Sequence, residues 1–156
     1  MTAATEAGAK QIWADGTSAA DPVVDAYFAS CGLKPFDPTP PCLRFAPNLQ
    51  HPDQYYFPTL LVQASNPADG KPTGGIQRLF LARGGKGKAQ VDKGKQKMSL
   101  GPMRGSVARL AEPVDGQPHI MGEGVETVAT AMQATGLAGW SVFGVSGLKA
   151  FVPRAP

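Results

Sequence analysis

Residues 118–145, PHIMGEGVETVATAMQATGLAGWSVFGV, determine the fold that we predict for the last third of the chain. Their pattern predicts a short strand at Pro118–Gly122, a helix at Val125–Gly136 and a buried strand at Trp140–Val145. The apolar face of that helix consists of Val125, Val128, Ala129 and Met132. A strand, a helix and a second strand within roughly 30 residues form the βαβ pattern, in which the two strands are parallel.

Upstream of this unit, the sequence predicts helices followed by a small, mostly antiparallel sheet. Residues 5–31 have a helical pattern, interrupted at Gly16-Thr17-Ser18 and closed at Cys31-Gly32. The second helix starts at Asp21-Pro22 or is capped by Thr17 or Ser18. Short strands are expected at residues 42–45, 59–64, 75–82, 97–100 and 106–110, with a turn at 66–74 and a loop at 83–88. The predicted fold class is therefore α+β.

Composition limits the classes of protein to which the chain can belong. Of its 156 residues 42% are hydrophobic, which is enough for a folded core, while 19 glycines and 15 prolines predict many turns. Seven of the prolines lie between Lys34 and Pro58 and exclude a long helix there. No run of 18 apolar residues is present, and the first residues lack the pattern of a secretory signal. We expect a cytoplasmic protein without a membrane partner.

The two cysteines, Cys31 and Cys42, are expected to be reduced thiols. They do not form a C-x-x-C pair, and the two histidines, His51 and His119, are far apart in the sequence. A structural zinc site usually needs four such ligands in close pairs. The sequence therefore predicts no zinc.

Glu123 and its neighbours are the most informative candidates for chemistry. Glu123 is expected where a parallel strand ends and a helix begins, which is the end of the strand where open α/β sheets bind ligands. Gly122 and Gly124 allow a tight turn there. A carboxylate at this position can bind Mg²⁺, or act as a general acid or base if its pKa is raised. The alternative is structural, because acidic residues are favoured in the first turn of any helix.

The stretch Glu123-Gly124-Val125-Glu126-Thr127, the helix after it and Ser146-Gly147-Leu148 resemble the start of a toprim domain, which occurs in primases, topoisomerases and related nucleases. Short motifs upstream are similar, in the same order, to those of phage- and plasmid-type primase and primase-helicase proteins. These motifs are Ile12-Trp13, Gly16-Thr17, Tyr27, Cys31-Gly32-Leu33, Leu43-Arg44-Phe45, His51-Pro52, Gly75-Ile76-Gln77-Arg78, Gly87-Lys88-Ala89, Met98-Ser99-Leu100-Gly101 and Val107-Ala108-Arg109-Leu110.

The resemblance implies two units. Residues 1–112 would form a primase-associated N-terminal α+β module, and residues 113–156 the start of a toprim domain, incomplete. It also implies catalytic roles for Glu123 and Glu126 and a Mg²⁺-binding role for Glu123. The chain departs from the family pattern at the toprim Asp-x-Asp, since no Asp follows Asp115, and at Gln77, where related sequences often have His. We therefore expect a chain that is not catalytically complete alone.

Basic residues are concentrated between positions 78 and 104. Eight of the 15 lysines and arginines fall there, opposed by a single acidic residue, Asp92. The eight are Arg78, Arg83, Lys86, Lys88, Lys93, Lys95, Lys97 and Arg104. Contact with nucleic-acid phosphates is the functional interpretation. The alternative is a solvated loop whose lysines aid solubility.

Two classes of function follow. The resemblance implies Mg²⁺-dependent RNA primer synthesis on single-stranded DNA during replication of a mobile element. Its partners would be single-stranded DNA or an RNA–DNA primer-template, together with a replicative helicase. The alternatives are a non-catalytic module that binds single-stranded nucleic acid, or a truncated product without independent activity. Among the remaining candidates, His51 and Asp53 are not expected to be catalytic, and Tyr55, Tyr56 and Phe57 are expected to cover a core edge.

Overall fold

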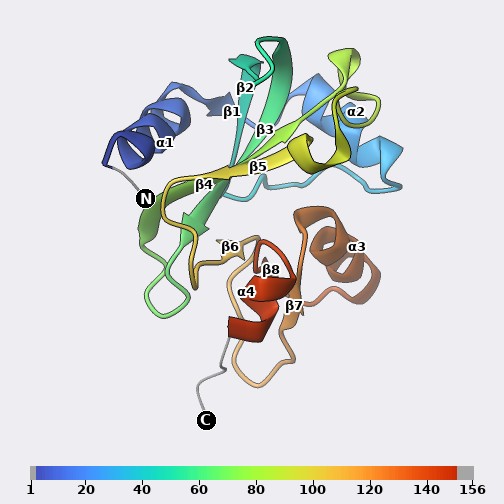
Figure 1. Cartoon of the computed structure of the whole chain (residues 1–156). Helices are drawn as coiled ribbons and strands as arrows, with labels where there is room; N and C mark the ends of the chain where they lie inside the picture. Colours follow the sequence, from blue (N-terminus) through green and yellow to red (C-terminus); the bar gives the residue numbers. More distant parts are fainter. Residues whose placement is uncertain (1–2, 151–156) are drawn as a thin grey trace.

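A five-stranded antiparallel sheet forms the larger part of the molecule, and a three-stranded sheet lies below it (Figure 1). The computed structural model describes residues 3–150. Strands of the larger sheet follow one another in chain order: β1 (Thr17–Ser18), β2 (Leu43–Gln50), β3 (Tyr56–Ser65), β4 (Pro72–Phe80) and β5 (Lys97–Leu100). This architecture confirms the predicted α+β class.

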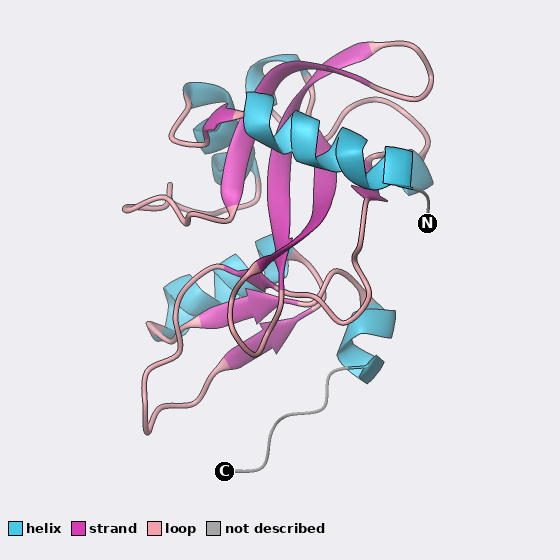
Figure 2. Ribbon diagram, turned by 90° about the vertical axis from the view of Figure 1, so that its left-hand side faces the viewer, coloured by secondary structure: helices cyan, strands magenta, loops and turns pink. Residues whose placement is uncertain are grey.

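Two helices cover opposite faces of the larger sheet. Figure 2 shows α1 (Ala3–Asp15) lying across one face. Successive residues of β3 point to opposite faces, as strand geometry requires. Leu61 packs with Ala9 of α1, whereas Leu60 and Val62 belong to the main core cluster with α2 (Pro22–Ser30). The sheet is therefore buried on both faces.

The start of α2 follows from its capping residues. Asp21 is the N-cap, and its carboxylate accepts a hydrogen bond from the backbone N–H of Val23 at 2.8 Å. Pro22, which lacks an N–H, occupies the first helical turn, where that donor would be unsatisfied in any case. Of the two predicted starts the structure selects Asp21-Pro22, since Thr17 and Ser18 pair with β2 as strand β1.

The strands β2 and β3 are longer than predicted. We expected strands at residues 42–45 and 59–64, bounded by the prolines between them, but the hairpin includes both Pro47 and Pro58. A register shift between Ala46 and Leu49 places Pro47 at an irregularity of the β2–β3 pairing. An irregularity tolerates a residue that cannot donate to the ladder. Proline therefore interrupts the pairing of these strands without ending them.

The smaller sheet contains the predicted βαβ unit. Its order is β6 (Ala108–Arg109), β8 (Gly139–Ser141), β7 (Ile120–Gly122), and β7 runs parallel to β8. The connection is α3 (Val125–Thr135), which ends at Gly136 in the left-handed conformation, with φ of 73°. The prediction was wrong at the end of the unit. The strand expected over residues 140–145 stops at Ser141, and Val145–Ala150 forms a helix, α4.

Two glycines let α3 pack closely on β7 and β8. A Cβ atom on Gly122 would lie 2.6 Å from one methyl group of Val128, and a Cβ on Gly139 would lie 2.6 Å from the other. Val128 is fully buried between them. This contact fixes the start of α3 at the carboxyl end of β7.

The two sheets share one hydrophobic core. A single buried cluster includes Phe28 of α2 and Leu60 of β3 together with Val125 and Val128 of α3. The backbones of Ser65 and Val107 also exchange two hydrogen bonds of 2.9 Å, linking the end of β3 to the segment before β6. The predicted boundary after residue 112 stays a prediction, and the core extends across it.

Single residues of the two sheets and the two cysteines can also be compared with the sequence. Trp140 is buried, as expected for the predicted buried strand, and Phe80 of β4 is buried as well. Cys31 and Cys42 are free thiols. Within residues 3–150, none of the helices combines the length and the apolar character needed to cross a bilayer.

Candidate functional site

A groove of about 460 Å³ opens where α2, the chain around residues 87–97 and the start of α3 meet. It is lined by Tyr27, Ser30, Cys31, Gly87, Lys88, Lys97, Glu123, Gly124, Glu126 and Thr127. Four of these residues, Lys88, Lys97, Glu123 and Glu126, were candidates from the sequence. These four residues lie up to 38 positions apart in the sequence, and the fold brings them to one groove.

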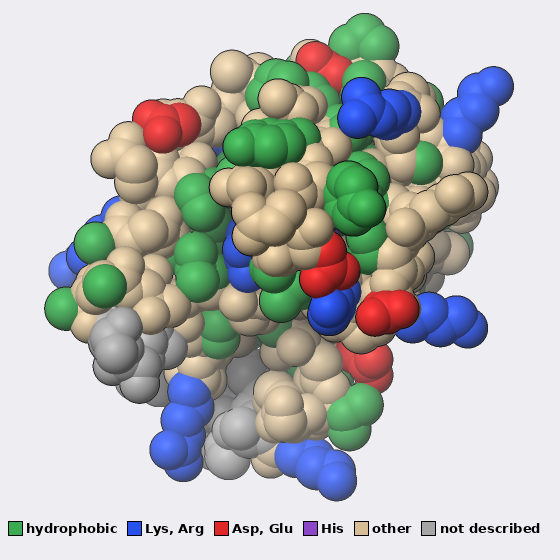
Figure 3. Space-filling model, turned by 45° about the horizontal axis from the view of Figure 1, so that its top comes forward, with side chains coloured by type: hydrophobic (Ala, Val, Ile, Leu, Met, Phe, Trp, Pro, Cys, Tyr) green, Lys and Arg blue, Asp and Glu red, His purple; other side chains and the backbone are tan. Residues whose placement is uncertain are grey.

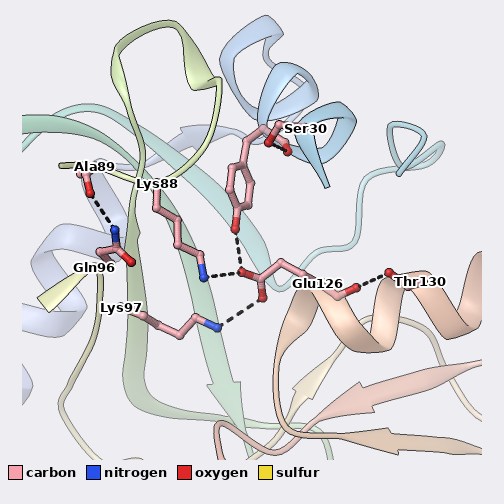
Figure 4. Close-up of polar contacts among 8 residues, drawn as sticks. Ser30, Lys88, Ala89, Gln96, Lys97, Glu126 and Thr130 are labelled. Carbon is pink, nitrogen blue, oxygen red and sulfur yellow. Dashed lines mark hydrogen bonds and ion pairs between the residues drawn. The ribbon is translucent and has the colours of Figure 1, made fainter. Parts of the chain in front are cut away.

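Glu126 lies at the centre of this groove (Figure 4). Its carboxylate accepts a hydrogen bond of 2.7 Å from the hydroxyl of Tyr27. The Nζ atoms of Lys97 and Lys88 lie 3.3 Å and 3.6 Å from its two oxygens. The side chain of Glu126 is 17% exposed, whereas those of Lys88 and Lys97 are 37% and 29% exposed, so the carboxylate is largely shielded from water and the lysines are not.

The protonation states in the cluster follow from these contacts. Burial acts to raise the pKa of Glu126, but Lys97, the tyrosine hydrogen bond and the second lysine outweigh it, so its pKa lies below the ordinary value. Burial, followed by the negative charge of Glu126, raises the pKa of Tyr27 well above its ordinary range. At neutral pH Glu126 is therefore ionised, and Tyr27 keeps the proton that it donates.

Glu123 is placed differently from Glu126. It follows β7 directly, lies on the rim of the groove and is exposed. Its backbone carbonyl accepts a hydrogen bond of 3.1 Å from the hydroxyl of Ser141, which ties the turn to the end of β8. In the described part of the chain its carboxylate has neither a hydrogen bond nor an ion pair. The sequence predicted that Glu123 follows the carboxyl end of a parallel strand, and β7, which ends at Gly122, is parallel to β8.

The fit of this site to Mg²⁺ depends on its oxygen donors. Glu123 offers one carboxylate that is open to solvent, whereas the carboxylate of Glu126 already faces two lysines. Among residues 3–150, no group of three or more His, Cys, Asp or Glu side chains is arranged to hold a metal ion. Mg²⁺ usually needs one or two carboxylates, with water completing the shell. Glu123 fits a single ligand position of such a site.

The eight predicted phosphate-binding residues do not form one surface. Lys88 and Lys97 line the groove, and Arg83, Lys86 and Lys93 are exposed on the loops that carry the short helices η1 (Arg83–Gly85) and η2 (Lys93–Lys95). Lys95 is paired instead with Asp53, at 2.7 Å. Arg104 is exposed in a separate depression beside Phe143 and Ser146.

Arg78 does not reach any of these surfaces. It is 8% exposed, lies over the ring of Phe80 at 5.8 Å, and donates a hydrogen bond of 3.4 Å from Nη2 to the carbonyl of Ser99. Burial lowers its pKa. This position in the middle of β4 leaves Arg78 out of the predicted contact with phosphates.

Sequence reasoning missed Tyr27 as a residue of the site. Its spacing with Val24 and Phe28 predicts a core residue, and its ring is indeed buried. The signal that was overlooked is chemical: a buried tyrosine hydroxyl needs a hydrogen-bond partner. That partner, Glu126, lies on a helix 99 residues away.

A second local arrangement involves the tip of the β2–β3 hairpin. His51 is 1% exposed, and its Nε2 lies 3.0 Å from the carbonyl oxygen of Lys95. Its ring packs edge-on against Phe57 and Phe80, so the histidine has a structural role. The prediction that Tyr55, Tyr56 and Phe57 cover a core edge holds for Phe57 alone. Tyr55 and Tyr56 are 67% and 46% exposed, because the residues at the hairpin tip extend past the core.

Comparison with known proteins gives a family without an assigned activity. Neither the curated proteins nor the solved structures include a match to the chain. One family model, described as a domain of unknown function, DUF7146, matches residues 3–110. The matched segment holds the whole five-stranded sheet, α1 and α2, and ends after β6. Since this match spans well over half of the residues, the chain belongs to the DUF7146 family.

Proposed function

We propose that this chain is part of a toprim primase-like protein that acts in replication of a mobile element. In this proposal its groove binds the phosphates of single-stranded DNA or of a primer-template, and Glu123 binds Mg²⁺. One observation carries the proposal: the exposed carboxylate of Glu123, at the end of β7, shares a groove with Lys88 and Lys97. This arrangement supports a site for a metal-bound phosphate group.

The charges of the groove support joint binding of cation and phosphate. Lys88 and Lys97 carry two positive charges, and Glu123 and Glu126 carry two negative ones, which cancel. A neutral groove attracts a polyanion weakly, since affinity for phosphates depends on unopposed positive charge. Mg²⁺ at Glu123 would give the groove two net positive charges. Each ligand would therefore strengthen the binding of the other.

Each residue has a separate role in this proposal. Glu123 would hold the metal, and Mg²⁺ would supply charge stabilisation on the transferring phosphoryl group. Lys88 and Lys97 would contact phosphate oxygens through the ammonium protons that do not face Glu126. Glu126 would act as a positioning residue, since its carboxylate already faces both lysines and Tyr27.

Primer synthesis with ribonucleotides and Mg²⁺ tests the enzymatic part of the proposal. The assay compares this chain with a version extended through an Asp-x-Asp motif, which would supply the further carboxylates. We expect activity from the extended version alone and its loss in the extended Glu123→Gln variant. Full activity of that variant would show that Glu123 has no part in the chemistry.

A second candidate function is a non-catalytic module that binds single-stranded nucleic acid. The observation that favours it is the exposure of Arg83, Lys86 and Lys93 on adjoining loops. These three side chains would contact phosphates without any metal. Under this alternative, Glu123→Gln leaves oligonucleotide affinity unchanged in Mg²⁺, whereas replacing the three basic residues with Ala weakens it.

A further inference from the structure

The tip of the β2–β3 hairpin presents two tyrosine side chains to solvent. Tyr55 is 67% exposed and Tyr56 is 46% exposed, and neither hydroxyl has a hydrogen-bond partner among residues 3–150. Among the described residues, the other large hydrophobic side chains of comparable exposure are Val114, Val145 and Leu148, and they lie in the last third of the chain. Figure 3 views the end of the molecule that carries the hairpin tip and shows exposed hydrophobic side chains among charged ones.

The backbone that carries these rings is held in place. The N–H of His51 donates to the carbonyl of Tyr55 at 2.7 Å, and the N–H of Asp53 donates to Nδ1 of the same histidine at 3.1 Å. The His51 ring is buried against two phenylalanines. A fixed backbone presents its aromatic side chains at a lower entropic cost of binding than a mobile loop does.

Lysines connect the hairpin tip to the groove. Lys95 contacts the tip twice, through its ion pair of 2.7 Å with Asp53 and through its carbonyl oxygen beside His51. Two residues further along the chain, Lys97 lies in the groove beside Glu126. Lys93, two residues before Lys95, is exposed. One short segment, residues 93–97, therefore runs from Asp53 and His51 at the hairpin tip to the proposed phosphate site.

Exposed aromatic rings beside a basic track are the arrangement by which proteins bind single strands. Basic side chains attract the phosphates, and the rings stack on bases, which are free for stacking when they are unpaired. In the segment 93–97 the exposed Lys93 supplies that charge, since Lys95 is paired with Asp53 and Lys97 with Glu126. We propose that Tyr55 and Tyr56 form a base-stacking surface for single-stranded nucleic acid whose backbone continues past Lys93 into the groove. This inference rests on the proposed function, and it adds preference for single strands over duplex.

Oligonucleotide binding by the full chain tests this surface. Tyr55→Ala and Tyr56→Ala should each lower affinity for a single-stranded oligonucleotide by about 5- to 150-fold, the range measured for the loss of one stacked base. Tyr55→Phe and Tyr56→Phe keep the rings and should bind like the wild type. Val114→Ala is the control, since Val114 is 54% exposed and lines a different depression, beside Pro35, Phe36 and Leu137.

Two further measurements isolate stacking from charge. An abasic oligonucleotide of the same length should bind the wild type and the alanine variants equally. The slope of affinity against salt concentration should be the same in all of them, since no phosphate contact is removed. A duplex of the same length should compete poorly with the single strand.

The outcomes separate this inference from the proposed function. If both alanine variants bind the oligonucleotide with the affinity and the salt dependence of the wild type, the proposed stacking surface is wrong. The proposed phosphate site in the groove would not be affected by that result. Failure of the wild type to bind any oligonucleotide would overturn both. Conversion of a dimer to a monomer by Tyr55→Ala, measured by sedimentation with oligonucleotide affinity unchanged, would show a protein interface instead and also overturn the inference.

Discussion

The hydroxyl of Tyr27 on α2 donates a hydrogen bond of 2.7 Å to the carboxylate of Glu126 on α3, 99 residues later in the chain. The same carboxylate faces Lys88 and Lys97. This cluster therefore joins the helix that covers the larger sheet to the helix of the βαβ unit. Its residues line the same groove as Glu123.

Removing the hydroxyl of Tyr27 should lower the stability of the protein. Tyr27→Phe keeps the buried ring but leaves the ionised Glu126 without one hydrogen bond, and such bonds to charged groups contribute about 1.5–3 kcal/mol. We expect a loss of that size in the free energy of unfolding, measured in urea. The matched control is Tyr55→Phe, at an exposed tyrosine, which should leave stability unchanged.

A double-mutant cycle shows whether the loss belongs to this contact. Glu126→Gln removes the charge, and Tyr27→Phe should then cost less in that background than in the wild type. Additive losses would contradict direct coupling between the two residues.

The stability of the protein should depend on pH through Glu126. Its pKa is lowered in the folded state from the ordinary value of 4.5, so its contribution is fully present above that value. The contribution is lost as the pH falls below 4.5 and through the lower folded-state pKa. Urea unfolding at pH 7, 4 and 3 should show this loss in the wild type and a smaller one in Glu126→Gln.

The close packing of α3 on the smaller sheet predicts that a larger residue at Gly139 lowers the stability of the protein. A smaller residue at Val128 should reduce that loss. Gly139→Ala would place a methyl group 2.6 Å from Cγ1 of Val128, and overpacking of this kind costs about 1–3 kcal/mol. Thermal unfolding should show a lower midpoint for Gly139→Ala. In a Val128→Ala background, Gly139→Ala should lower the unfolding midpoint by less, because the methyl groups that the new Cβ would meet are gone. An equal cost in both backgrounds would mean that Val128 is not the obstacle.

Local signals predicted the elements that place Glu123. The apolar face of α3, its glycine stop and the strand before it are all short-range patterns, and the parallel pairing of β7 with β8 followed from them. The strand at Lys97–Leu100 was predicted with its observed bounds. The prediction for the end of the βαβ unit was wrong because Phe143 and Gly144 adopt φ values of 60° and 126°, which turn the chain out of the sheet. Residue type alone does not show such a turn at a phenylalanine.

Contacts between distant segments could not be predicted from the sequence. The basic stretch between residues 78 and 104 looked uniform, but the fold buries Arg78, pairs Lys95 with Asp53 and turns Lys97 towards Glu126. Neighbouring side chains on a strand point to opposite faces, and their partners come from other parts of the chain. The sequence thus indicated which residue types were present, and the tertiary structure determined which of them share a site.

The effect of Mg²⁺ on oligonucleotide affinity, compared between the wild type and Glu123→Gln at matched ionic strength, tests the central claim most directly. Without Mg²⁺ the variant should bind single-stranded DNA more tightly, because it lacks a negative charge at the rim of the groove. With Mg²⁺ the order should reverse, because only the wild type holds the cation beside the phosphates. Any effect of Mg²⁺ on the DNA itself is common to both proteins. The same order of affinities with and without Mg²⁺ would contradict joint binding of metal and phosphate at Glu123.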